Sequence, residues 1–175
     1  MRALALTLVA AVAGALAAAS GARDDAPLCS APRLAVAYVT SGGAAGSVDV
    51  EYSFRNRGPG MCSLSGYPKV AMLSASARPV HTSESPAPGA YGVHVATVAL
   101  APGGSAYFGI HYAAATGFGN LKCPASAALA FTPPGAKQSL TLRGKGGAIQ
   151  PYGGSIPHLQ CGIVHVSALS AKRVL

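Results

Sequence analysis

Hydrophobic and polar residues alternate most regularly in the stretch SVDVEYSFRN, residues 47–56. The apolar set is Val48, Val50, Tyr52 and Phe54, and the polar set is Ser47, Asp49, Glu51, Ser53 and Arg55. Successive side chains of a β-strand point to opposite faces, so this two-residue period predicts a half-buried strand. We expect the apolar set to lie in a core and the polar set to face solvent.

Seven more short stretches have strand character, and turn clusters such as SGGAAG, NRGPG, APGGS and TPPG separate them. They are Leu34–Thr40, Lys69–Ser74, Val93–Leu100, Ala106–Tyr112, Ala128–Thr132, Ser139–Arg143 and Gly162–Ser167. The 22 Gly and 13 Pro residues leave little room for helices. About eight short strands in one domain predict an all-β, antiparallel sandwich. A Ser- and Pro-rich stretch, Ala75–Ala90, is expected to form a long loop.

The N-terminal stretch has one early charge, Arg2, and then an Ala-, Leu- and Val-rich run that ends in small residues. This pattern predicts a secretory signal peptide at residues 1–22, cleaved after Ala19 or Ala22. A retained membrane anchor is the alternative, but the run is short and mostly Ala. We then expect a short disordered start at 23–28, a β domain at 29–170 and a C-terminal tail at 171–175. The protein is expected to be secreted, extracellular or cell-wall associated, without a stable membrane anchor.

Thirteen Lys and Arg residues outnumber five Asp and Glu residues, which gives a formal net charge of +8. Such a charge can attract anionic polymers, including those of a cell wall. The basic residues are scattered along the chain, however, without a basic run or an aromatic-rich basic motif. The pattern argues against nucleic-acid binding. The simpler interpretation is a surface that is short of acidic residues.

The four cysteines are Cys29, Cys62, Cys123 and Cys161. An even number in an exported chain favours disulfides, and three pairings are possible. We favour Cys29–Cys62 and Cys123–Cys161, because each closes a loop of roughly 35 residues and ties neighbouring strand regions together. The long spacings do not suit a zinc site, and no histidine stands beside Cys62 to activate a thiolate.

Catalytic residues are not apparent in the sequence. No Gly-x-Ser-x-Gly elbow occurs, and Asp49 and Glu51 are expected on the solvated face of one strand rather than across a cleft. Three histidines lie inside predicted strands: His94, His111 and His165. If those strands were adjacent, the three imidazoles could converge on a metal ion. We expect no enzyme activity and no cofactor, and keep a histidine-based metal-binding protein as an alternative to be tested.

Several motifs occur in a fixed order. They are LCS at the start of the domain, then GAAGSVDVEYSFRNRG, CSLSGYPKVAML, VALAPGGSAYFGIHY and CPASAALAFTPPG, with a last Cys in the final third. This order resembles an actinobacterial family of secreted proteins and lipoproteins, domain of unknown function 4232. The resemblance covers roughly 29–166 and implies an immunoglobulin-like sandwich outside the cell, without an established activity. Many members carry a lipid-anchoring cysteine after the signal, which this chain lacks.

These observations together predict a secreted, non-enzymatic binding or structural module outside the cell or in its envelope. We expect its unknown partner, a protein or an envelope component, to bind loops at one end of the sandwich, Arg55–Met61 and Ala75–Ala90. This expectation depends on an analogy between folds. Adhesion to an anionic wall polymer and a hydrolase remain the competing functions.

Overall fold

The computed structural model describes residues 26–44, 47–113, 126–143 and 163–175. Eleven β-strands form within them. They are β1 (Leu34–Ala44), β2 (Ser47–Asn56), β3 (Cys62–Ser65), β4 (Lys69–Leu73), β5 (Pro79–Val80), β6 (Ser83–Pro86), β7 (Thr97–Leu100), β8 (Ser105–Ala113), β9 (Ala128–Thr132), β10 (Leu140–Arg143) and β11 (Ile163–Val166). Two single 3-10 turns, η1 (Ala31–Arg33) and η2 (Ala90–Gly92), complete the regular structure of the described residues.

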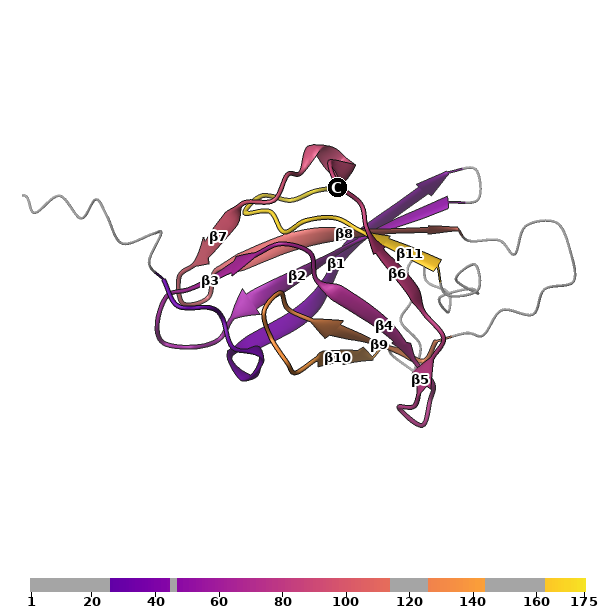
Figure 1. Cartoon of the computed structure of the whole chain (residues 1–175), viewed down its shortest axis with the longest axis horizontal. Coiled ribbons are helices and arrows are strands. Elements are labelled where there is room, and N and C mark those ends of the chain that lie inside the picture. The colour runs from indigo at the N-terminus through magenta and orange to yellow at the C-terminus, as the bar shows by residue number, and fades with distance from the viewer. Residues whose placement is uncertain (1–25, 45–46, 114–125, 144–162) are drawn as a thin grey trace, which may run out of the picture.

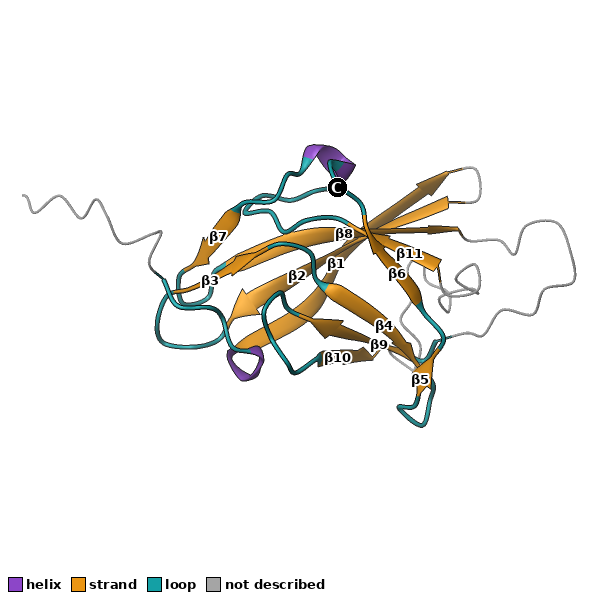
Figure 2. Ribbon diagram, viewed as in Figure 1, coloured by secondary structure: helices purple, strands orange, loops and turns teal. Residues whose placement is uncertain are grey.

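The strands form two packed layers (Figures 1 and 2). One is a five-stranded sheet with the order β1-β2-β8-β11-β6, and the other is a four-stranded sheet with the order β10-β9-β4-β5. Strands β3 and β7 pair separately. All strand pairs are antiparallel except β11 with β6. The predicted all-β sandwich is confirmed.

The core lies between the two larger sheets and is built around four aromatic rings. The Tyr52 ring lies 4.7 Å from that of Phe131, and the Phe54 ring lies 5.0 Å from that of Phe108, measured between ring centres. Val48, Val50, Tyr52 and Phe54 are all buried, as the alternation in β2 predicts. Burial of such large apolar side chains is the main force that holds the two layers together.

All eight predicted strands occur, but three short strands were not predicted. Strand β3 has the sequence CSLS, and β5 and β6 lie inside the stretch 75–90 that was expected to be a loop. Prolines and serines hide the pattern of β5 and β6, because they are typical of loops and of sheet edges. Strand β7 starts only at Thr97, so His94 lies in a loop and not in a strand.

A disulfide joins Cys29 to Cys62, as predicted. It fastens the segment before η1 to β3, and hydrogen bonds extend this contact towards the N-terminus. The Ser63 amide donates to the Pro27 carbonyl over 2.8 Å, and Ser63 Oγ donates to the Ala26 carbonyl over 2.8 Å. The expectation of disorder up to residue 28 is therefore wrong for residues 26–28.

Two predictions fall on parts of the chain that the structure does not describe. The signal peptide and its cleavage sites lie within residues 1–25, and both cysteines of the Cys123–Cys161 pair also lie outside the described residues. Within the described residues, no helix has the length and apolar character that crossing a membrane would require.

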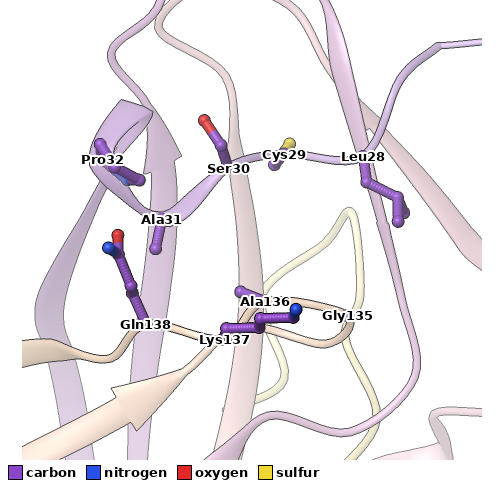
Figure 3. Close-up of a pocket in the computed structure, with 9 residues that line it drawn as sticks. All are labelled: Leu28, Cys29, Ser30, Ala31, Pro32, Gly135, Ala136, Lys137 and Gln138. Atoms are coloured by element: carbon purple, nitrogen blue, oxygen red, sulfur yellow. The ribbon is translucent and has the colours of Figure 1, made fainter.

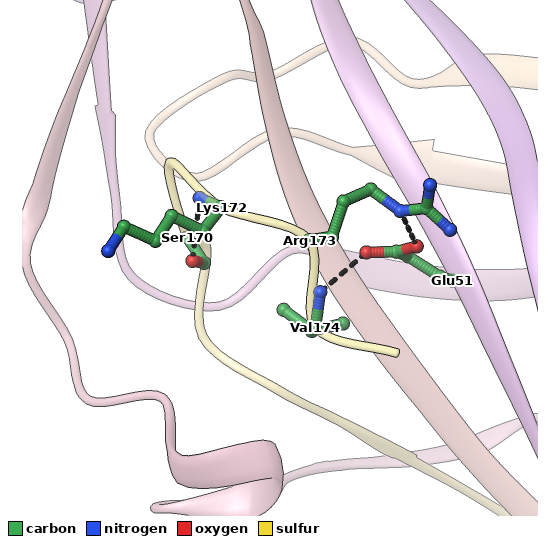
Figure 4. A network of polar contacts seen from close by, with 5 residues as sticks. All are labelled: Glu51, Ser170, Lys172, Arg173 and Val174. Carbon is green, nitrogen blue, oxygen red and sulfur yellow. Dashed lines mark hydrogen bonds and ion pairs between the residues drawn. The ribbon is translucent and has the colours of Figure 1, made fainter.

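The polar face of β2 is not solvated along its length, contrary to expectation. Glu51 is completely buried and Ser53 is 7% exposed. The C-terminal segment contacts Glu51 directly. Arg173 Nε donates a hydrogen bond to Glu51 Oε2, and the Val174 amide donates to Oε1 over 2.6 Å (Figure 4). Residues 171–175 therefore form a docked tail, which holds a buried carboxylate.

Candidate functional site

Four polar side chains form a row across the outer face of the five-stranded sheet. Asp49 of β2 is opposite His111 of β8, His111 is opposite His165 of β11, and His165 is opposite Ser85 of β6. The row is open to solvent, with 32% of the Asp49 side chain and 43% of the His111 side chain exposed. Strand register alone brings together residues that lie up to 116 positions apart, from 49 to 165.

Hydrogen bonds divide this row into two pairs. His111 Nδ1 lies 2.9 Å from Asp49 Oδ1, and His165 Nδ1 lies 2.8 Å from Ser85 Oγ. The two imidazole rings are neighbours, with centres 6.3 Å apart and planes inclined by 31°. Each ring is thus oriented through its Nδ1 atom.

Tyr91 of η2 provides a third contact to the row. Its hydroxyl donates to Asp49 Oδ1 over 2.5 Å, and its backbone is left-handed, with φ 57° and ψ 22°. Burial, followed by the hydrogen bond to Asp49, raises the pKa of the Tyr91 phenol far above its usual range, so the group stays a donor. A left-handed non-glycine residue costs on the order of 1–3 kcal/mol, and such strain clusters at functional sites.

The row is not arranged as a hydrolytic triad. In a triad, the imidazole that takes the proton of the nucleophile is also the one that the carboxylate orients. Here Ser85 contacts His165, whereas Asp49 contacts His111. Serine, histidine and aspartate are all present on one face, but Ser85 and Asp49 contact different histidines.

The three histidines of the metal hypothesis have different positions. His111 and His165 come together, whereas His94 lies in the exposed loop before β7. Within the described residues, no three His, Cys, Asp or Glu side chains are placed to hold one ion. Sequence reasoning also missed Asp49 and Tyr91 as partners of His111, because strand register across β2 and β8 has no local signal.

A second candidate site is a hollow of about 530 Å³ at the end of β2, called here the arginine hollow. Its lining residues are Ala35, Arg55, Asn56, Arg57, Gly58, Pro102 and Gly103. Arg33 adjoins it, since its carbonyl accepts the Arg57 amide over 2.7 Å and its side chain lies against Gly58. Two arginines therefore line one surface depression and a third adjoins it, although the basic residues are scattered in the sequence.

Buried Asn56 holds the loop of the arginine hollow in place. Its Nδ2 donates to the carbonyls of Gly60 and Leu100 over 2.8 and 3.0 Å, and its Oδ1 accepts the Gly58 amide over 2.8 Å. Arg55 is fixed as well, because its Nε donates to the Gly103 carbonyl over 3.1 Å. The hollow is therefore preformed around its charged side chains.

The two loops that were expected to bind a partner together lie at opposite ends of the molecule. Arg55–Met61 leads into β3, whereas β5, within 75–90, lies at the far end of the long axis (Figure 1). A third hollow of about 340 Å³ lies between residues 28–32 and 135–138 (Figure 3). Lys137 is its one charged lining residue, so it offers less to a ligand than the arginine hollow does.

The fold defines an all-β sandwich protein with an open polar row on one sheet and a basic hollow at one end. The chain belongs to the family described as Domain of unknown function (DUF4232), whose model matches residues 29–167. This confirms the resemblance seen in the motifs. No curated protein and no solved structure matches the chain significantly.

Proposed function

We propose that this protein is an exported, non-enzymatic binding module that recognises anionic polymer of the cell envelope through the arginine hollow. Export is supported by the signal-like segment at 1–22 and by the Cys29–Cys62 disulfide, which is typical of oxidising compartments. A binding role is supported by the division of the polar row into two pairs, which does not provide the relay of a hydrolase.

The observation that carries this proposal is the gathering of Arg33, Arg55 and Arg57 around one preformed hollow. Arginine presents a planar fork of donors that matches phosphate and carboxylate oxygens. Arg55 is anchored through Nε, and its terminal nitrogens make no hydrogen bond with the part of the chain that the structure describes. The hollow therefore suits an anion better than a neutral ligand.

Within the described residues, no acidic side chain neutralises the arginine hollow. The three acids in the described residues are Asp49, Glu51 and Glu84, and none lines the arginine hollow. Asp49 is engaged by His111 and Glu51 by Arg173. The positive potential of the hollow is therefore available to an approaching polyanion.

The test measures binding of fluorescently labelled polyphosphate and polyglutamate to the oxidised chain at two salt concentrations. We expect binding that weakens as salt rises. Arg55→Gln/Arg57→Gln should lose about 30-fold in affinity, since two lost charge-assisted contacts contribute about 1 kcal/mol each. The two probes distinguish phosphate from carboxylate ligands.

The matched control is Arg78→Gln/Arg143→Gln, which removes the same charge near the opposite end of the molecule. Both arginines are exposed, Arg78 directly precedes β5, and Arg143 ends β10. The control should bind within twofold of the unmodified chain. An equal loss in both double variants would show attraction to net charge alone and would overturn the hollow as the binding site, as would the absence of binding to either probe.

A further inference from the structure

His111 and His165 both use the ring nitrogen Nδ1 for a hydrogen bond, which leaves the other ring nitrogen, Nε2, to be considered. The Nδ1 atoms are occupied by Asp49 and Ser85, and no hydrogen bond within the described residues engages either Nε2. A carboxylate can only accept, so Nδ1 of His111 carries the proton, and Nε2 of the neutral ring holds a lone pair. The Ser85 hydroxyl can accept as well as donate, so His165 can adopt the same tautomer.

The Asp49–His111 pair has the arrangement of a supported metal ligand. Ligating histidines almost always donate their second ring N–H to a carboxylate or carbonyl, which fixes the tautomer and raises ligand basicity. The Tyr91 hydroxyl donates to the same Oδ1 atom of Asp49 that His111 contacts. The Tyr91 ring lies against Gly109, which is two residues before His111 on β8. A strained tyrosine, a carboxylate and an imidazole thus form one preorganised chain of contacts.

We propose that His111 and His165 bind one divalent transition-metal ion through their Nε2 atoms, with water in the remaining positions. Bonds of about 2.0–2.1 Å would place the ring centres about 4.5 Å apart for neighbouring ligands of square-planar Cu(II) and about 5 Å apart for tetrahedral Zn(II). The observed pair, with ring centres 6.3 Å apart, would therefore close by about 1–2 Å. Rotation of two accessible side chains can supply such a movement. Imidazole ligands and the order of divalent affinities favour Cu(II) over Zn(II) here.

This site is separate from the arginine hollow and does not depend on the proposed function. Asp49 and Arg55 lie six residues apart on β2, which is about 20 Å along a strand. Two protein ligands also agree with the lack of a three-residue cluster in the described residues. The open positions would let the bound ion reach a further ligand from solution.

The experiment titrates CuCl2 and ZnCl2 into the oxidised chain, purified without a histidine tag, and follows binding by calorimetry and Cu(II) electron paramagnetic resonance. We expect one Cu(II) per chain, a spectrum with two imidazole nitrogens and weaker binding of Zn(II). His165→Asn and His111→Asn should each abolish this site. Asp49→Asn should weaken binding about 10–100-fold, as is typical when the hydrogen-bond partner of a metal-ligating histidine is lost.

His81→Asn is the matched control, because His81 is an exposed histidine between β5 and β6 and outside the row. It should keep the affinity of the unmodified chain. Thermal unfolding identifies any variant that fails to fold, and His165→Asn is the decisive one, since the side-chain contacts of His165 are with Ser85 and the His111 ring. Wild-type binding in folded His165→Asn, an equal loss in His81→Asn, or no binding by the unmodified chain would overturn the proposal.

Discussion

Asp49 and Glu51 lie two residues apart on the same face of β2, yet their surroundings differ. Glu51 is completely buried under the C-terminal segment, where Arg173 and the Val174 amide hold its carboxylate. Asp49 stays about one-third exposed and contacts His111 and Tyr91. One acid therefore fastens a structural element, whereas the other supports an open polar row. The alternation of a strand assigns residues to a face, and it does not say what covers that face.

The largest loss of stability should come from replacing Arg173, whose guanidinium group is the charged partner of buried Glu51. In Arg173→Ala the buried carboxylate keeps the Val174 amide but loses its charged partner, so the free energy of unfolding should fall by about 2–4 kcal/mol. Because 51% of the Arg173 side chain is exposed, water can replace part of this contact and limits the loss. Urea unfolding of the oxidised chain measures the change.

Lys172→Ala is the control for the Glu51 region. The Lys172 side chain points away from Glu51 (Figure 4), and its loss should change the free energy of unfolding by less than about 0.5 kcal/mol. If Arg173→Ala were as mild as Lys172→Ala, the tail would not be docked in solution, and the contrast between the two acids would disappear.

A smaller loss of stability is expected from Gly109→Ala, which acts on Tyr91, a partner of Asp49. A β-carbon at this position would lie 2.3 Å from Cε2 of Tyr91, so the ring would have to move away from Asp49. Such overpacking costs about 1–3 kcal/mol in the free energy of unfolding. Urea unfolding of Gly109→Ala, Tyr91→Ala and the double variant should show strong coupling, because the clash needs both side chains. Additive effects would mean that Tyr91 does not lie over Gly109.

The smallest effect concerns pH and the hydroxyl of Tyr91. The pKa of this phenol is raised in the folded state, whereas an unfolded tyrosine loses its proton near pH 10. Above about pH 10 the folded chain holds more protons than the unfolded chain, so stability falls as pH rises, by up to about 1.4 kcal/mol per pH unit for one group. Tyr91→Phe should flatten this fall when unfolding is followed from pH 9 to 11. If the stability of Tyr91→Phe and that of the unmodified chain fell equally with pH, the Tyr91 hydroxyl would lie in solvent and the predicted effect would be wrong.

Much of the fold was predictable because it depends on local pattern. The alternation from Val48 to Phe54 identified the core face of β2. An even number of cysteines predicted disulfides, and loop length favoured the Cys29–Cys62 pairing that the structure contains. Strands β5 and β6 were missed because serine and proline carry no apolar period, and the parallel pairing of β6 with β11 has no sequence signal.

The candidate sites were less predictable. His111 and His165 were recognised as candidates, but their partners Asp49, Tyr91 and Ser85 come from three other segments. The basic residues were interpreted as scattered, whereas chain folding gathers Arg33, Arg55 and Arg57. Each of these groupings depends on which strands and turns become neighbours.

The sequence by itself determined the class of the fold, the inward face of β2 and the family, and it favoured the pairing of Cys29 with Cys62. Only the tertiary structure decided that Glu51 is buried, that Asp49 supports His111 and that three arginines share one hollow. The physical reason is the range of the interactions involved. Periodicity and turn chemistry act within a few residues, whereas burial of a polar face and convergence of side chains require contacts between segments that are distant along the chain.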